Sequence, residues 1–226
     1  MKTVVITGST RGIGRGLAEN FLKLGCRVVL SGRQQGAVDA VVEQLSALGE
    51  VSGLACDISC SDDLQALWDH AVEQGGGVDI WINNAGISIA KRPLDEQQPS
   101  HIESIVQTNL TGLLLACRVA MIGMKRQAYG QIWNMEGFGS NGAVQPGMAS
   151  YGATKRAVNY LNKALRKDVA GSGVQICTLS PGIVVTDLLV GDYDTSSPEW
   201  QKSKRIFNIL GDRVETVTPW LAANVL

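Results

Sequence analysis

Short runs of β-branched and apolar residues alternate along the chain with longer stretches whose apolar residues recur every three to four positions. The short runs predict strands, and the longer stretches predict amphipathic helices. The predicted strands cover residues 4–6, 27–30, 54–58, 79–82, 131–135 and 174–179. The predicted helices cover residues 15–24, 37–48, 64–72, 102–126 and 151–169.

The predicted strands are apolar on both faces, which is typical of strands covered by helices on both sides of a sheet. Strict alternation of strand and helix predicts parallel strands joined by right-handed crossovers. We therefore predict an α/β fold, a doubly wound parallel sheet of the Rossmann type, as a single domain over residues 1–226. Residues 182–220 follow the last predicted strand and are interpreted as a substrate lid, although a tolerated surface insertion explains their composition equally well.

Composition narrows the class of protein. The 226 residues contain 20 Lys and Arg against 21 Asp and Glu, so no cationic excess favours nucleic-acid or anionic-membrane binding. No apolar run approaches the length of a membrane span, and the apolar start is too short for a signal peptide. Five cysteines without a Cys-x-x-Cys pair, and only two histidines, predict no metal site and a reducing compartment. We expect a soluble intracellular protein.

A glycine-rich loop joins the first predicted strand to the first predicted helix. Gly8 permits a tight turn, Gly12 lets the backbone approach a pyrophosphate, and Gly14 lets helix and strand pack closely. The N-terminus of the following helix offers free N–H groups and a positive dipole end. The loop thus predicts dinucleotide binding, and the alternative is a glycine-rich turn that binds nothing.

The end of the second predicted strand indicates which dinucleotide binds. A carboxylate there would bind the ribose 2′-hydroxyl of NAD, but the sequence reads Ser31-Gly32-Arg33. Arg11 and Arg33 together match the geometry of a 2′-phosphate, although either arginine alone is more often a solvated surface residue. The pattern favours NADP(H).

Tyr151 and Lys155 stand four residues apart on a predicted helix and so share one face. We expect the ammonium of Lys155 to lower the pKa of the Tyr151 phenol from its ordinary value near 10. Tyr151 could then give its proton to a carbonyl oxygen while a hydride arrives from the cofactor. This spacing alone also occurs on ordinary helices.

Several further motifs occur in a fixed order. They are Gly8, Gly12 and Gly14, then Cys56-Asp57-Ile58, Asn83-Asn84-Ala85-Gly86, Asn109, Tyr151 with Lys155, and Pro181-Gly182. In this order they resemble the short-chain dehydrogenase/reductase family from residue 2 to about residue 189. The resemblance implies NADP(H) contacts at Gly8, Ser9, Thr10, Arg11, Gly12, Ile13, Gly14, Arg33, Asp57, Ile58, Asn84, Ala85, Gly86, Tyr151, Lys155, Pro181, Gly182, Val184 and Thr186.

The same resemblance implies residue roles and assembly. Asn109 would bend its helix and order a water that passes protons to Lys155. Asp57 would face the adenine amino group, and its alternative role is to cap the following helix. A homodimer or homotetramer would form through the helices 102–126 and 151–169, and the substrate would be a small-molecule carbonyl compound.

The sequence departs from the family where a serine usually polarises the carbonyl. Gly137 and Phe138 occupy that place, and Ser140 is the nearest hydroxyl. We predict that Ser140 takes the role of the usual serine. The alternative is that Ser140 is only a loop residue and that catalysis rests on Tyr151.

The unusual segment from Glu136 to Ser140 points to one branch of the family. Extended back to Asn134, and together with residues 81–86, 92–94, 186–189, 207–209 and 215–217, it is similar to the soluble form of the chlorophyll(ide) b reductases. These reduce a 7-formyl group to hydroxymethyl with NADPH. Alternatives are a reductase of another aldehyde or ketone, and a catalytically quiet NADP(H)-binding regulator. The location would be cytoplasmic in a bacterium, or the plastid stroma in a plant or alga.

Apolar and aromatic residues of the predicted lid suit a large flat substrate, and their alternative role is packing of lid helices onto the core. They are Trp200, Phe207, Ile209, Leu210 and Trp220.

Overall fold

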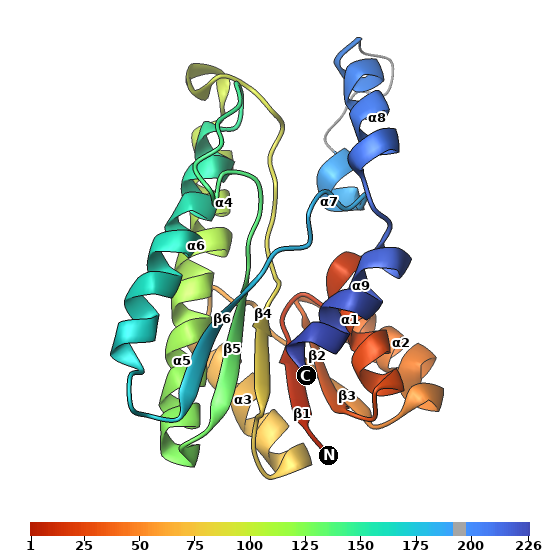
Figure 1. Ribbon diagram of the computed structural model, residues 1–226, viewed down its shortest axis with the longest axis vertical. Coiled ribbons are helices and arrows are strands. Elements are labelled where there is room, and N and C mark those ends of the chain that lie inside the picture. Colours follow the sequence, from red (N-terminus) through yellow and green to blue (C-terminus); the bar gives the residue numbers. More distant parts are fainter. Residues whose placement is uncertain (192–197) are drawn as a thin grey trace.

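The computed structural model describes residues 1–191 and 198–226, apart from the side chains of residues 198, 199, 202 and 206. Six parallel strands form one sheet in the order β3-β2-β1-β4-β5-β6 (Figure 1). This order reverses direction at β1, which confirms the predicted doubly wound sheet. The strands are β1 Thr3–Ile6, β2 Arg27–Gly32, β3 Val51–Ala55, β4 Ile80–Asn83, β5 Gly130–Met135 and β6 Val174–Leu179.

Helices cover both faces of the sheet because the central strands are apolar on both sides. One buried cluster joins the sheet to α3, α5 and α6, and the other joins it to α1, α2 and α9. Trp81 of β4 and Phe21 of α1 are among the largest fully buried side chains of these two clusters. The helices are α1 Gly12–Lys23, α2 Gln35–Leu45, α3 Ser61–Gly75, α4 Pro99–Val106, α5 Leu113–Gln127, α6 Ala149–Asp168, α7 Asp187–Val190, α8 Pro198–Leu210 and α9 Val214–Val225.

The third strand lies earlier than the sequence predicts. It spans Val51–Ala55 and not residues 54–58, with Val51 beside Val28 of β2. The strand ends where the carboxylate of Asp57 accepts hydrogen bonds from the backbone N–H and the hydroxyl of Ser59. This Asx turn starts the path into α3, and it overrides the apolar run through Ile58.

The helix predicted over residues 102–126 is divided. Helix α4 is followed by a π-helical turn, Gln107–Gly112, and then by α5. Gly112 packs so closely on Ile58 that a Cβ would lie 2.8 Å from the Ile58 Cδ1. Single π turns inside helices are frequent at functional sites, and Asn109 lies in this one.

The stretch Pro99–Gln127 is also long and apolar enough to cross a membrane, with a mean hydropathy of 1.5 over its best window, and it is the single such stretch among the described residues. In the structure this stretch covers the sheet, with buried residues from Leu113 to Met124 packed against β4, β5 and α3. Packing on the sheet accounts for its apolar composition.

The segment after β6 leaves the sheet and returns to it. Val184 and Asp212 form an isolated parallel bridge, with hydrogen bonds from Val185 N to Asp212 O and from Asp212 N to Ile183 O. Helices α7 and α8 lie between these two points and extend away from the sheet (Figure 1). Residues 214–220 of the expected lid lie in α9, which packs against α1.

Candidate active site

The loop between β1 and α1 brings glycines against neighbouring backbone. Gly8 and Gly12 have φ angles of 63° and 56°, in the left-handed region that favours glycine. A Cβ on Gly8 would lie 2.8 Å from the Cα of Ala85, and one on Gly14 would lie 2.5 Å from the backbone oxygen of Gly8. The loop can therefore keep this path only with glycine at positions 8 and 14.

Helix α1 begins directly after this loop. Its N-cap residue, Arg11, makes no side-chain hydrogen bond to the first turn. The first N–H groups and the positive end of the helix dipole are thus left for an anion. Thr186 flanks the same turn, since its Cγ2 lies 3.7 Å from where a Cβ on Gly12 would be. The residues present fit the pyrophosphate of a dinucleotide.

The residues after β4 close the other side of the loop. The side-chain nitrogen of Asn84 donates to the backbone oxygens of Thr7 and Gly8, at 2.9 Å each. The hydroxyl of Thr7 accepts from the backbone N–H groups of Asn84 and Ala85, at 3.1 Å each. Thr7 opens the glycine-rich loop, but the sequence indicated no role for it, although a hydroxyl at the carboxyl end of a central strand was the available signal.

No carboxylate ends β2, where Ser31 is buried and Arg33 is exposed. The other predicted phosphate-binding arginine, Arg11, has its Nη1 3.7 Å from Asp187 Oδ2, with the two side chains 77% and 79% exposed. Ion pairs this exposed contribute little. Arg11 is therefore held only weakly. It lies in the loop between β1 and α1, and Arg33 lies in the loop between β2 and α2.

Asp57 forms the Asx turn described above, and the N-cap of α3 is Cys60. Hydrogen bonds from Ser59 lower the pKa of Asp57, and the nearby charge of Arg33 lowers it further. Asp57 is therefore a carboxylate at neutral pH. Its neighbour Ile58 is buried against Gly112.

Tyr151 and Lys155 share one face at the N-terminal end of α6. The Nζ of Lys155 lies 5.9 Å from the centroid of the Tyr151 ring and donates to the backbone oxygen of Met135 at 3.3 Å. A Cβ on Gly137 would lie 2.6 Å from the Tyr151 hydroxyl and 3.1 Å from the Lys155 Cε. The phenol and the lysine stem therefore converge on one point of backbone, just beyond the carboxyl end of β5.

Burial sets the proton affinities of this pair. It raises the pKa of Tyr151 to about 12, whereas we expected the ammonium of Lys155 to lower it. Burial also lowers the pKa of Lys155 to about 8, against an opposing effect of the Glu136 carboxylate. The expectation was wrong in direction because burial removes the hydration of the phenolate in this structure.

Ser140 is buried in the loop after β5, and its hydroxyl bonds to Gly137. It donates to the Gly137 backbone oxygen at 2.8 Å and accepts from the Gly137 N–H at 3.1 Å. Arg156 of α6 donates to the Ser140 backbone oxygen at 2.9 Å. Ser140 thus fixes the backbone of Gly137 opposite the Tyr151 hydroxyl.

Asn109 joins the π-helical turn to the segment after β4. Its Oδ1 accepts from the Ile87 N–H at 2.8 Å, and its Nδ2 donates to the Ile87 oxygen at 2.9 Å. The Nδ2 also lies 3.4 Å from the hydroxyl of Thr154, which neighbours Lys155 on α6. Asn109 therefore ties Gly86 and Ile87 to the helix that carries the tyrosine.

A buried row of amides beneath the site was missed by the sequence analysis. The Nδ2 of Asn83 donates to Asn134 Oδ1 at 2.8 Å, and the Nδ2 of Asn134 donates to Asn162 Oδ1 at 2.6 Å. Asn83 and Asn134 are cross-strand neighbours, and Asn162 lies two turns after Lys155 on α6. Asn134 inside a predicted apolar strand, and Asn83 directly after another, were the available signal.

Comparison with known proteins places the chain in a family. The family model described as short chain dehydrogenase matches residues 2–196. The chain is 39% identical over 230 residues to the chloroplastic chlorophyll(ide) b reductase NOL of Oryza sativa subsp. japonica, covering 98% of this chain and 66% of that protein. It is 34% identical to 3beta-hydroxysteroid dehydrogenase 1 of Eggerthella lenta, covering 83% of this chain and 72% of that protein.

The chain spans less of a longer relative, the probable chlorophyll(ide) b reductase NYC1 of Arabidopsis thaliana. It is 38% identical to that protein, covering 96% of this chain and 46% of the relative.

Solved structures show the same fold. A 7 alpha-hydroxysteroid dehydrogenase complexed with NADH superposes with a TM-score of 0.85 at 24% identity, covering 98% of this chain and 86% of that one. A metagenomic short-chain oxidoreductase in complex with NADP gives a TM-score of 0.73 at 29% identity, covering 82% and 83% of the two chains. The chain belongs to the short-chain dehydrogenase family.

Proposed function

We propose that the chain is an NADPH-dependent carbonyl reductase in which Tyr151 is the proton donor. The observation that carries the proposal is the convergence of the Tyr151 hydroxyl and the Lys155 stem on Gly137. This point lies at the carboxyl ends of the strands, where the glycine loop and the first turn of α1 also lie. A phenol and a dinucleotide cradle at one sheet edge suit reduction of a carbonyl group.

In this mechanism bound NADPH supplies the hydride. Tyr151 donates its proton to the carbonyl oxygen as negative charge develops there. With a pKa of about 12 the phenol holds its proton at neutral pH and is available as a donor. Lys155, with a pKa of about 8, is mostly an ammonium at pH 7 and can return a proton to the phenolate. Asn109 holds the segment at Gly86 and Ile87 in place beside them.

We assign Ser140 to positioning and not to carbonyl binding. Its buried hydroxyl is engaged with both backbone groups of Gly137. The proton transfer then rests on Tyr151, which is the second of the two alternatives that the sequence left open. Ser140 contributes by holding the loop that shapes the space around the phenol.

We propose NADP(H) as the cofactor. Support comes from Arg11 and Arg33 beside the cradle and from Ser31 in the place of a carboxylate. A 2′-phosphate would give both exposed guanidinium groups an anionic partner. The remaining predicted contacts, including Asp57, Asn84 and Thr186, would line the same nucleotide.

The leading substrate is the 7-formyl group of a chlorophyll(ide) b, reduced to hydroxymethyl. The 39% identity to a chlorophyll(ide) b reductase over 98% of this chain supports it. So do the apolar side chains beyond the sheet: Ile209 and Leu210 of α8 are 79% and 64% exposed. The 34% identity to a hydroxysteroid dehydrogenase supports the alternative, reduction of another aldehyde or ketone.

We further propose that residues 182–220 close over the substrate and that the chain forms a homodimer or homotetramer. A groove of about 430 Å³ along α5 and α6, lined by apolar side chains such as Leu114, Met121 and Leu165, supports the assembly. Light scattering on the purified protein measures it, and a monomer would contradict it. The enzyme would act in the plastid stroma in a plant or alga, and in the cytoplasm in a bacterium.

The function is tested by mixing the protein with NADPH and chlorophyllide b and following the absorption band of the formyl group. We expect loss of that band with one NADPH oxidised per formyl group. Turnover of simpler carbonyl compounds without loss of the formyl band would favour the alternative substrate class. NADPH binding with no turnover over a broad carbonyl panel would mean a nucleotide-binding regulator.

A further inference from the structure

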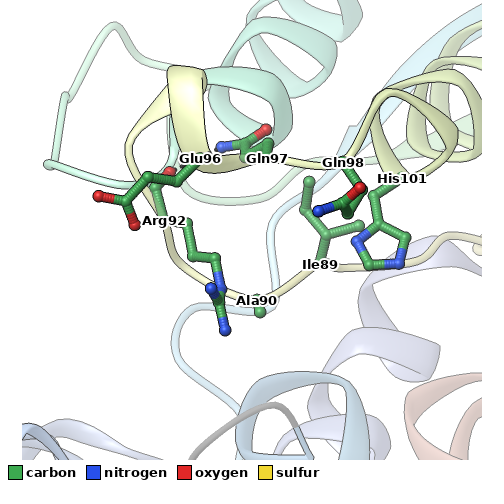
Figure 2. A pocket seen from close by; sticks show the side chains of 7 residues that line it. All are labelled: Ile89, Ala90, Arg92, Glu96, Gln97, Gln98 and His101. Carbon is green, nitrogen blue, oxygen red and sulfur yellow. Dashed lines mark hydrogen bonds between the residues drawn. The ribbon is translucent and has the colours of Figure 1, made fainter.

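The segment between β4 and α4 forms a cavity that the proposed mechanism does not use. The cavity has a volume of about 210 Å³, and its lining includes Ile89, Ala90, Arg92, Glu96, Gln97 and His101 (Figure 2). It combines apolar side chains, Ile89 and Ala90, with two side chains able to bind an anion. Arg92 also belongs to the segment 92–94, which resembles one branch of the family. The proposed mechanism gives this segment no role.

Hydrogen bonds fix this cavity to the start of α6. The hydroxyl of Ser150, next to Tyr151, donates to the side-chain oxygen of Gln97. The side-chain nitrogen of Gln97 donates to the backbone oxygen of Arg92 at 2.8 Å. A Cβ on Gly147 would lie 3.1 Å from the backbone nitrogen of Arg92. These hydrogen bonds therefore connect the cavity lining to the start of α6, next to Tyr151.

The charges around the cavity favour an anion. Among the residues that the structure describes, no carboxylate lies within 4.0 Å of the Arg92 guanidinium. Figure 2 shows the side chains of Arg92 and His101 extending downward in the view, whereas Glu96 extends to the left and carries its carboxylate away from both. The acidic residue of the lining thus leaves the arginine unpaired.

We propose that Arg92, assisted by His101, binds a carboxylate on the substrate whose carbonyl group faces Tyr151. The guanidinium matches a carboxylate as a two-pronged donor, and Ile89 and Ala90 would contact the apolar body next to it. This rests on the proposed function. Chlorophyllide b carries a free propionate, which is esterified in chlorophyll b, so the enzyme prefers the free acid.

The test compares chlorophyllide b with its propionate methyl ester, in the wild type and in Arg92→Gln. Binding is followed by quenching of tryptophan fluorescence in the presence of NADP⁺, independently of turnover. We expect Arg92→Gln to weaken binding of the acid about tenfold and that of the ester less than twofold. His101→Gln weakens binding of the acid about threefold, since the side-chain amide can still donate a hydrogen bond.

Arg126→Gln serves as the matched control, because Arg126 is an exposed arginine at the far end of α5. It leaves binding of both ligands unchanged. Raising the salt concentration weakens binding of the acid more than binding of the ester in the wild type, and this difference disappears in Arg92→Gln. Equal affinity of the wild type for acid and ester, or an equal loss of both in Arg92→Gln, overturns the proposal.

A second set of compounds separates this proposal from the substrate assignment. NADPH oxidation is measured with a series of aldehydes of increasing separation between formyl group and carboxylate, each as the free acid and as its methyl ester. If the macrocycle is not reduced but KM rises in Arg92→Gln for the carboxylated aldehydes alone, the carboxylate site stands and the macrocycle assignment fails. If the macrocycle is reduced at the same KM as acid and as ester, the assignment stands and the carboxylate site is rejected.

Discussion

Two glycine-rich loops of this chain follow central strands and lead into helices, but they use glycine differently. In the loop after β1, Gly8 packs on the backbone at Ala85 and the path leads to uncapped N–H groups of α1. In the loop after β5, Gly137 packs on the hydroxyl of Tyr151. The first loop leaves its helix N-terminus for a ligand, whereas the second fills the corresponding space with a side chain of its own helix.

This difference explains why one loop departs from the family pattern and the other does not. The space over Gly137 is occupied by the phenol, so a larger residue at 137 would displace the group proposed to transfer the proton. Ser140 then has no open path to a substrate from its buried position between the two backbone groups of Gly137. The comparison predicts that added methyl groups in the two loops separate catalysis from nucleotide binding.

Of the added methyl groups in the two loops, the one in Gly137→Ala has the larger expected effect. The new Cβ would lie 2.6 Å from the Tyr151 hydroxyl, so the phenol must shift. We expect kcat to fall about 100-fold because small misplacements of a reacting group are that costly. NADPH binding stays within about twofold. Gly152→Ala on α6 is the control, since a Cβ there meets no heavy atom within 4 Å. An unchanged kcat in Gly137→Ala would contradict the placement of the phenol.

Gly8→Ala should produce the opposite pattern. Its φ of 63° and the 2.8 Å approach to Ala85 strain any side chain. We expect the Kd for NADPH to rise about 30-fold, equivalent to about 2 kcal/mol of strain. Gly36→Ala, where a Cβ meets nothing within 4 Å, controls for the substitution itself. Titration followed by NADPH fluorescence measures the Kd of both variants. Equal Kd values would contradict the claim that the loop after β1 binds the dinucleotide.

Buried charge also distinguishes the two loops. Lys155 is 9% exposed beside the second loop, whereas Arg11 of the first is exposed. Lys155→Met should raise the free energy of unfolding at pH 7 by on the order of 2 kcal/mol, while abolishing activity. Lys163→Met, on the exposed face of α6, is the control and should have little effect.

The pH dependence of that stabilisation has a defined sign. Burial lowers the pKa of Lys155 in the folded protein from 10.5 to about 8. Between these values the unfolded wild type binds more protons than the folded one, so its stability rises with pH relative to the variant. The advantage of Lys155→Met is therefore full below about pH 8 and fades toward pH 10.5. An advantage independent of pH would mean that the lysine is not buried as a charge.

Ser140→Ala is expected to have the smallest effect. The variant loses the hydrogen bonds to both backbone groups of Gly137. We expect kcat to fall about tenfold as the loop loosens, compared with the 100-fold or greater loss typical of a removed oxyanion donor. Ser172→Ala removes a similar bond, from the Ser172 hydroxyl to the backbone oxygen of Val169, far from the site. A kcat loss near 1000-fold would restore Ser140 as a carbonyl donor.

The sequence predicted the fold well because strand and helix periodicities report burial directly. It also predicted the close packing at Gly8 and Gly14 and the shared helix face of Tyr151 and Lys155, since these depend on local spacing. It misplaced β3 because an apolar run through Ile58 does not reveal the Asx turn at Asp57. The hydrogen bonds of the Asp57 carboxylate to Ser59 determine where β3 ends.

Features that depend on distant contacts could not be predicted. The pKa direction of Tyr151 follows from burial by elements separated along the chain, and the role of Ser140 follows from which backbone groups it meets. A bend at Asn109 was implied by the family resemblance, but the contacts at the π turn Gln107–Gly112, from Asn109 to Ile87 and from Gly112 to Ile58, were not. Spacing along one helix contains none of this information.

The most direct test of the account is steady-state carbonyl reduction by Tyr151→Phe, with NADPH binding measured on the same preparation. We expect a kcat about 1000-fold below the wild type for every carbonyl substrate that the wild type reduces, with the Kd for NADPH changed less than twofold. A variant that retains more than about a tenth of the wild-type kcat would contradict the claim that this phenol supplies the proton.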